Sequence, residues 1–157
     1  MRVRLNKILE PILIAILGLM VLSVCWQVTS RYVMQDPSSY TEELSRFLLI
    51  WLAMLGAAYA AGQRLHLAIN LIPDRLSDAT RIKLLKFQNV LILFFAGAVF
   101  CLGGGRLVYI TYYLDQSSPA LGLPLFWVYL ILPVSGMVII LYQLADLFTI
   151  NELPDDH

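Results

Sequence analysis

The sequence predicts an all-α integral membrane protein with four transmembrane helices, and three observations lead to this prediction. Hydrophobic residues make up 59% of the 157 positions and charged residues only 14%, whereas a typical soluble domain has about 25% charged residues. Four apolar runs are each longer than the roughly 20 residues with which a helix crosses a bilayer. Lysine and arginine are concentrated in alternate connections between these runs. We expect a single membrane domain over residues 1–157.

The four expected crossings differ in how their ends are marked. The first follows a basic N-terminal segment, but its apolar stretch exceeds the about 7–15 residues of a signal peptide, so we expect it to be retained. Ser39, with Glu42 three residues later, fits a capping box at the start of the second. Pro133 is expected to kink the fourth. The crossings cover about residues 11–33, 41–62, 89–113 and 125–150.

The distribution of positive charge predicts the orientation of the chain. Three lysine or arginine residues precede the first crossing, and five lie in the connection between the second and third. The connections 34–40 and 114–124 and the tail 151–157 carry none. Because cytoplasmic loops carry the excess of lysine and arginine, we expect both termini in the cytoplasm.

The connection between the second and third crossings contains an amphipathic stretch. Over residues 75–86 the basic and the apolar side chains fall on different helical faces. This pattern predicts an interfacial amphipathic segment between helices 2 and 3. A separate helix in the membrane plane and an extension of the third crossing both agree with the pattern.

Several functional classes lack the residues that they need. The two histidines, His66 and His157, lie outside the crossings, which argues against a membrane haem protein. Cys25 and Cys101 form no CxxC pair, so neither a zinc site nor a dithiol site is indicated. The sequence has no Ser-His-Asp arrangement and no basic stripe for nucleic acid. We therefore expect no enzyme activity, no catalytic residue, no metal, no cofactor and no nucleic-acid partner for this chain.

Charged residues that touch the membrane segments gather toward the expected outer side. At the start of the second helix, Glu42 and Glu43 both lie within one turn of Arg46, so either can pair with it. The functional hypothesis makes the charged set a candidate site for partner docking or subunit pairing. The alternative is interface anchoring with internal salt bridges. The candidates are Arg31, Glu42, Glu43, Arg46, Arg106 and Asp115.

Small residues at four-residue spacing predict close helix packing on two of the crossings. Packing within the chain and packing against a second chain would both explain such stripes. The residues are Ala53, Ala57 and Ala61 on the second helix, and Gly97, Cys101 and Gly105 on the third.

Short motifs along nearly the whole chain carry a resemblance to a known family. They are Arg31-Tyr32-Val33, residues 40–46 (YTEELSR), residues 56–60 (GAAYA), His66, residues 119–124 (PALGLP), Trp127 and Pro133. As an ordered set they resemble the DctQ-type small membrane subunit of tripartite ATP-independent periplasmic (TRAP) transporters. The chain departs from the family pattern at Leu65, where glycine is usual, and at Asn70, where aspartate is frequent.

The resemblance implies a small, non-catalytic scaffold subunit of a sodium-coupled secondary transporter in the bacterial inner membrane. It implies a large elevator-type membrane subunit as partner, with sodium bound in that subunit, and a periplasmic substrate-binding protein as a second partner. Membrane lipids would surround the chain. The imported substrate would be an organic acid such as a dicarboxylate or sialic acid.

An independent four-helix transporter acting as a homo-oligomer is the alternative hypothesis. Such a protein needs a carboxylate or a broken helix near the middle of the membrane. Glu10 and Asp146 instead lie at the inner ends of their helices, where solvent is expected to be near. A membrane anchor of a redox enzyme is disfavoured because the crossings contain no histidine.

Overall fold

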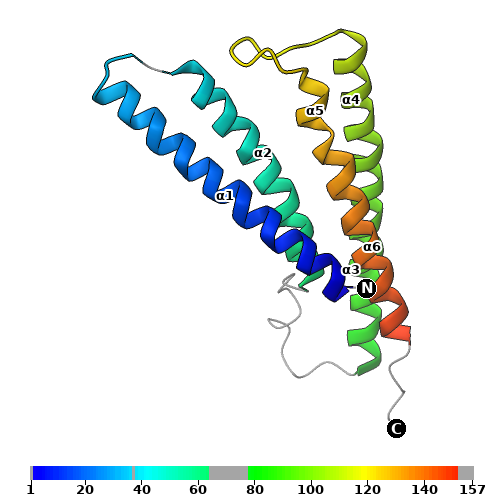
Figure 1. Cartoon of the computed structure of the whole chain (residues 1–157). Coiled ribbons are helices and arrows are strands. Elements are labelled where there is room, and N and C mark those ends of the chain that lie inside the picture. Colours follow the sequence, from blue (N-terminus) through cyan, green and yellow to red (C-terminus); the bar gives the residue numbers. More distant parts are fainter. Residues whose placement is uncertain (1, 37, 64–77, 152–157) are drawn as a thin grey trace.

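A computed structural model gives the structure of residues 2–36, 38–63 and 78–151, and all structural statements concern these ranges. The chain is helical throughout them, apart from short connections (Figure 1). The elements are α1 (Arg2–Tyr32), α2 (Ser39–Gly62), α3 (Asp78–Phe95), the π-helical segment η2 (Ala96–Gly103), α4 (Gly104–Tyr113), α5 (Leu125–Tyr129) and α6 (Ile131–Asn151).

Four helical stretches are long and apolar enough to cross a membrane, which confirms the expected fold class. Their bounds overlap the expected crossings, although the third begins earlier on the chain. That residues 1–157 form one domain stays a prediction. The stretches are Leu5–Tyr32, Ser39–Gly62, Lys83–Tyr113 and Leu125–Leu147.

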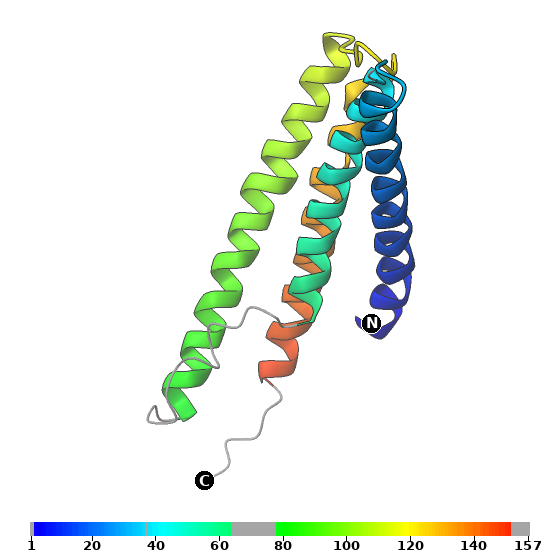
Figure 2. The same cartoon turned by 90° about the vertical axis from the view of Figure 1, so that its left-hand side faces the viewer.

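The third crossing is one continuous helical rod made of α3, η2 and α4. Residues 78–86 therefore extend the third crossing and do not form a separate helix in the membrane plane, while residues 75–77 lie outside the described part of the chain. From Asp78 to Tyr113 such a rod is roughly 50 Å long, which exceeds the about 30 Å hydrocarbon core of a bilayer. Its first turns extend past the end of α6 (Figure 2).

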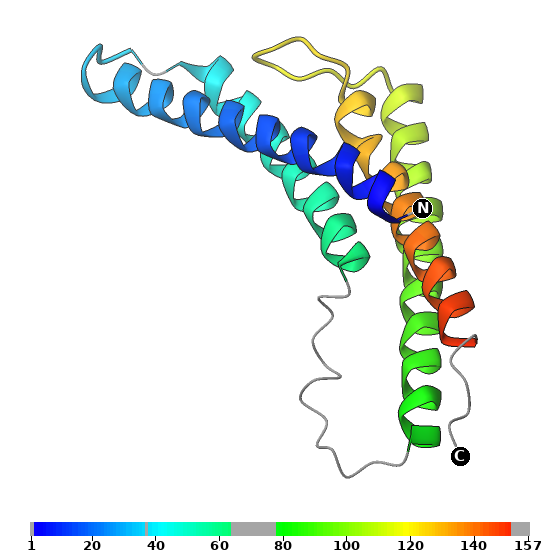
Figure 3. The same ribbon diagram turned by 60° about the horizontal axis from the view of Figure 1, so that its bottom comes forward.

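The helices form two groups that diverge in the shape of a V (Figures 1 and 3). One group is the antiparallel pair α1 and α2, and the other contains the third crossing with α5 and α6. The groups converge at the end where both chain termini lie, which we call the terminal end. They separate at the opposite end, the loop end, where the connections 33–38 and 114–124 lie.

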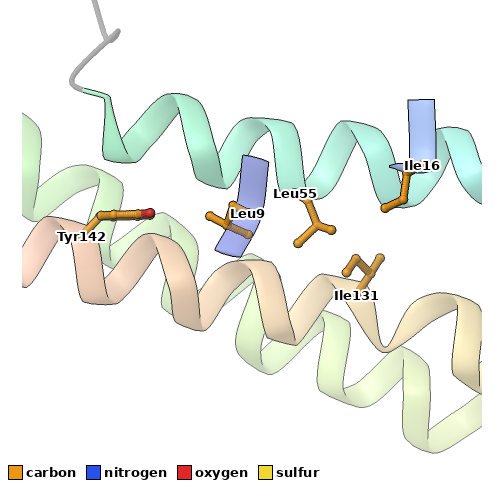
Figure 4. Close-up of a cluster of buried hydrophobic side chains, with 5 residues drawn as sticks. All are labelled: Leu9, Ile16, Leu55, Ile131 and Tyr142. Carbon is orange, nitrogen blue, oxygen red and sulfur yellow. The ribbon is translucent and has the colours of Figure 1, made fainter. Parts of the chain in front are cut away.

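Two clusters of buried side chains hold the groups together. The larger joins α1, α2 and α6 and consists of Leu9, Ile16, Leu55, Ile131 and Tyr142 (Figure 4). The smaller joins α2, η2 and α6 and consists of Ala58, Ala61, Ala96 and Ile139. Alanine dominates the second cluster because small side chains let helix backbones approach closely.

The ring of Tyr142 on α6 packs against the backbone of Gly62 on α2. A Cβ atom added to Gly62 would lie only 2.5 Å from Cζ of Tyr142, so the tyrosine ring rests directly on the glycine backbone. The Tyr142 hydroxyl donates a hydrogen bond to Oδ1 of Asn6 at 2.6 Å. One buried tyrosine therefore connects α6 to both helices of the other group at the terminal end.

Two expected local signals differ from the structure in detail. The capping residue of α2 is Ser38, and its side chain makes no capping hydrogen bond. The expected capping box of Ser39 and Glu42 is therefore wrong, because the Glu42 carboxylate bonds Arg46 instead. The expected kink at Pro133 takes the form of a break at Leu130, between α5 and α6. Proline has no N–H to donate one turn back, and its place in the first turn of α6 means that no hydrogen bond in the interior of that helix is lost.

Replacing Gly62 with alanine tests the contact between the α2 backbone and the Tyr142 ring. We expect Gly62→Ala to lower the melting temperature of the detergent-solubilised protein, because the added Cβ overlaps the ring of the fully buried Tyr142. Overpacking of this kind costs about 1–3 kcal/mol. The matched control is Gly56→Ala on the same helix, where a Cβ would meet nothing within 4 Å. An equal response of both variants in a thermal unfolding assay would contradict the assigned contact.

Candidate functional site

The main polar connection between the two helix groups at the loop end is made by Glu43. Its Oε2 atom accepts hydrogen bonds from the backbone N–H groups of Ala120 and Leu121, both at 3.0 Å. The Ser118 hydroxyl also accepts a hydrogen bond from the Leu121 N–H, at 3.2 Å. Hydrogen bonds to an ionised acceptor are about twice as strong as neutral ones. We call this arrangement of Glu43 and residues 118–122 the Glu43 clamp.

The connection after α4 is shaped to present these two N–H groups. The N–H of Ser118 bonds the carbonyl of Leu123, and the N–H of Gly122 bonds the carbonyl of Ser118, both at 2.9 Å. Gly122 has a φ of +66°, a conformation that glycine adopts without strain. The turn is therefore closed by its own hydrogen bonds, and Ser118 is only 2% exposed.

The neighbouring charged pair has a different character. Arg46 contacts Glu42 at 3.2 Å within α2, and the two side chains are 66% and 60% exposed. An exposed pair of this kind contributes about 0.3–0.5 kcal/mol. Of the two carboxylates expected near Arg46, the structure thus gives Glu42 to the arginine and Glu43 to the loop.

The other three charged candidates lie apart from the clamp. Arg31 is in the last turn of α1 and Arg106 is in the first turns of α4, and both are exposed. Asp115 follows the end of α4 with a φ of 47°, a left-handed conformation that aspartate tolerates. In the described ranges, no salt bridge involves any of these three residues. Within the described ranges the structure thus gives hydrogen-bond partners to Glu42, Glu43 and Arg46, and the contact of all six candidates with a partner chain stays a prediction.

The sequence did not predict the hydroxyl hydrogen bonds that join α1 to α2 near the Glu43 clamp. Ser23 donates to the carbonyl of Thr41 at 3.1 Å, and Ser45 donates to the Ser23 hydroxyl at 3.0 Å. Trp51 reaches the other group, donating from Nε1 to the carbonyl of Val128 at 3.1 Å. A serine inside an otherwise apolar run, such as Ser23, is the sequence signal that points to such a contact.

A second polar layer lies toward the terminal end. Tyr59 on α2 donates to Oε1 of Glu10 on α1 at 2.9 Å, and Gln63 donates to the Tyr59 hydroxyl at 2.8 Å. Glu10 is exposed, as expected, but Asp146 is only 6% exposed. The expectation that Asp146 lies near solvent is wrong, because α6 packs against both α2 and α3.

The two predicted small-residue stripes are placed differently. On α2, Ala61 is buried, whereas Ala53 and Ala57 are exposed. The face that α2 turns inward carries Leu55 and Ala58 instead. Gly97, Cys101 and Gly105 on the third crossing are half-buried. Packing of the exposed alanines against a second chain stays a prediction.

The remaining expectations concern three residues outside the described part of the chain and the absence of a metal site. Leu65, His66 and Asn70 lie outside the described part of the chain. Within the described ranges, no group of three or more His, Cys, Asp or Glu side chains is placed to hold a metal ion.

The structure is that of a small multi-pass membrane protein. Side-chain hydrogen bonds join its four spanning helices, and a carboxylate holds one of its loops. Residues 20–151 match the family model of the DctQ component of tripartite ATP-independent periplasmic transporters. The chain belongs to this family, which confirms the resemblance seen in the motifs. The family consists of transporter permease components and not of enzymes, and its members are multi-pass proteins of the inner membrane.

Individual relatives agree with this assignment. The chain is 27% identical over 149 residues to the sialic acid TRAP transporter small permease protein SiaQ of Vibrio cholerae, covering 95% of this chain and 84% of SiaQ. It is 30% identical over 135 residues to a putative TRAP transporter small permease protein of Haemophilus influenzae, covering 86% and 82%. It is also 28% identical over 152 residues to the isethionate TRAP transporter permease protein DctMQ of Oleidesulfovibrio alaskensis, covering 88% of this chain but 22% of DctMQ.

Removing the Glu43 carboxylate tests the clamp directly. In Glu43→Ala, the N–H of Ala120 loses its acceptor and the N–H of Leu121 keeps only the more distant Ser118 hydroxyl, at 3.2 Å, so we expect amide hydrogen exchange in residues 116–125 to accelerate several-fold. Hydrogen–deuterium exchange with mass spectrometry measures this in detergent or nanodiscs. The matched control is Glu42→Ala, whose carboxylate bonds only the exposed Arg46 and should leave that peptide unchanged. Unaltered exchange in both variants would show that the carboxylate does not hold the turn.

Proposed function

We propose that this chain is the small, non-catalytic scaffold subunit of a sodium-coupled, binding-protein-dependent transporter that imports an organic acid across the bacterial inner membrane. The alignment with DctMQ carries the proposal. The chain matches 22% of a longer protein that is itself named a TRAP transporter permease. We therefore expect this chain to work beside a much larger membrane part.

The use of polar side chains in the described helices supports a scaffold role. A transporter that binds its substrate within the membrane needs polar groups that converge on a cavity. Here Glu43, Ser45, Trp51 and Tyr59 all bond another helix or the loop of the same chain. Their hydrogen-bonding capacity serves to hold helices and loop in place.

The outer surface of the helices offers the area that an anchoring subunit needs. Most residues of α1 from Leu5 to Tyr32 are exposed, among them large apolar side chains such as Ile14, Leu22 and Trp26. Such a surface fits lipid chains and transmembrane helices of a larger subunit. The large subunit would hold sodium and substrate and move, while this chain stays in place beside it.

The exposed charged residues are the proposed contact points. Arg31, Arg106 and Asp115 have no ion pair within the described ranges, and the Glu42–Arg46 pair is open to solvent. We expect these residues to face the large membrane subunit or the periplasmic binding protein. The names of the relatives, which include sialic acid and C4-dicarboxylate transporters, support an organic acid as substrate.

Independent transport by a homo-oligomer has one observation in its favour, the burial of Asp146. This residue lies five positions before the end of α6 at Asn151. A carboxylate there is at the membrane surface and not near its middle, where a coupling site is expected. The scaffold function therefore explains the structure better.

Reconstitution separates the two functions. We expect proteoliposomes with this chain alone to show no uptake of labelled organic acid, and uptake to require the co-purifying large subunit, the binding protein and a sodium gradient. Glu43→Arg should weaken uptake or assembly, because an arginine cannot accept the loop N–H groups. The control is Glu42→Arg at equal membrane abundance. Uptake by the chain alone would refute the scaffold function.

A cysteine in the connection after α4 tests the orientation. Ser117 is exposed whereas Ser118 is buried, so Ser117→Cys is the suitable probe. We expect an impermeant thiol reagent to label it from the periplasmic side of intact cells, in a background where Cys25 and Cys101 are replaced by serine. Labelling only after the membrane is permeabilised would reverse the orientation.

A further inference from the structure

Two buried polar side chains lie at the contact surface between α3 and α6, which we call the α3–α6 seam. None of the hydrogen bonds described above involves either of them. Asn89 is 9% exposed and Gln143 is 2% exposed. The Nδ2 atom of Asn89 and the Oε1 atom of Gln143 are fully buried, and neither has a hydrogen-bond partner within the described ranges. A buried polar atom without a partner is unfavourable, and no membrane lipid can supply one.

The antiparallel register places these two side chains opposite each other. A Cβ atom on Gly136 would lie 3.4 Å from the carbonyl oxygen of Ala96, so these positions face each other across the seam. Gln143 lies seven residues after Gly136, and Asn89 lies seven residues before Ala96. Seven residues are about two helical turns, so equal steps along the two antiparallel helices bring both amides to the same layer.

Helix faces lead to the same conclusion. Ile139, one turn before Gln143, packs in the same cluster as Ala96. Ile92, one turn after Asn89, packs against that cluster as well. Because residues three and four apart lie on one helical face, both amide side chains continue the faces that are already in contact.

The two orphan atoms are chemically complementary. Nδ2 of Asn89 is a donor and Oε1 of Gln143 is an acceptor, so one water molecule can accept from the first and donate to the second. A cation would be repelled by the hydrogens of the Asn89 amide. Buried waters in proteins satisfy polar groups of this kind. We propose that the α3–α6 seam holds a buried water site between Asn89 Nδ2 and Gln143 Oε1.

The surroundings of the site limit how far water penetrates. Toward the loop end, Ile139, Ala96 and Ile92 close the seam with apolar side chains. Toward the terminal end, the next turn of α6 carries the buried Asp146. Apolar side chains therefore close the site toward the middle of the membrane, and polar groups continue on its other side.

Synchrotron X-ray radiolysis with mass spectrometry detects such a water, because radicals formed from bound water oxidise the adjacent side chains. The sample is the full-length chain in nanodiscs with the membrane subunit that co-purifies with it. We expect oxidation of Ile139 in spite of its burial, and none of Ile131, which is equally buried in the apolar cluster of Figure 4. The oxidation should disappear in the double variant Asn89→Leu/Gln143→Leu.

Thermal unfolding of the same variants provides an independent readout. Each single substitution removes one of the two amides, so the water bridge is lost and the other amide stays buried without its partner. We therefore expect the melting temperature to fall by roughly 5 °C. The double variant removes both polar groups and should recover most of this loss. Gln88→Leu, at the half-buried neighbour of Asn89, is the matched control and should change little.

Each outcome decides for or against the water site. Oxidation of Ile139 together with recovery in the double variant supports it. Recovery without oxidation would replace the water with a direct amide–amide hydrogen bond, and additive losses in the double variant would show that the two side chains do not interact. A melting temperature that rises when sodium replaces choline would assign the site to a cation. Each of the last three results overturns the proposal.

Discussion

The contact between Gly62 and Tyr142 sets the geometry on which the rest of the fold depends. The Tyr142 ring fills the space between α6 and the backbone of α2, so that even a methyl group on Gly62 would overlap it, and the hydroxyl of the same tyrosine bonds Asn6 on α1. Lipid chains are as apolar as leucine, so close packing and hydrogen bonds, more than the hydrophobic effect, associate helices in a bilayer. Both kinds of interaction meet in this one side chain at the terminal end.

The divergence of the two helix groups makes the loop end depend on a different interaction. Packing at Gly62 cannot hold helices whose axes separate toward the other end of the V (Figure 1). There the Glu43 clamp connects α2 to the loop that leads into α5, and Trp51 adds a hydrogen bond to Val128. A carboxylate is tolerated at this point because it lies near the end of its helix, and its charge is stabilised by the two N–H donors.

These two connections give a physical basis to the proposed role. A subunit that stays in place while a neighbour moves needs a fixed shape more than a cavity, and here the polar groups join helices to each other at both ends. The buried amides of the α3–α6 seam extend this logic, since a bridging water would satisfy them where no side chain does. Membership of the DctQ family and the shape of the chain are independent observations, and both support the proposed scaffold role.

Much of this protein follows from the sequence alone. The four spans, the start of α2 at Ser39 and the family are readable because apolar length and short motifs are local properties of the chain. Glu43 was singled out as a site residue, but its partners are 77 and 78 residues away, and only the packed structure brings Ala120 and Leu121 to it.

The tertiary structure also decided which helix faces point inward. Ala58 and not Ala57 packs inside, Asp146 is buried although its position suggested solvent, and the fourth crossing is interrupted at Leu130, three residues before Pro133. Every side of a membrane helix is apolar, so hydrophobic periodicity, which marks the inward face in soluble proteins, carries little information here. Composition therefore determined that the helices cross the membrane, and pairwise contacts between distant residues determined how they are arranged.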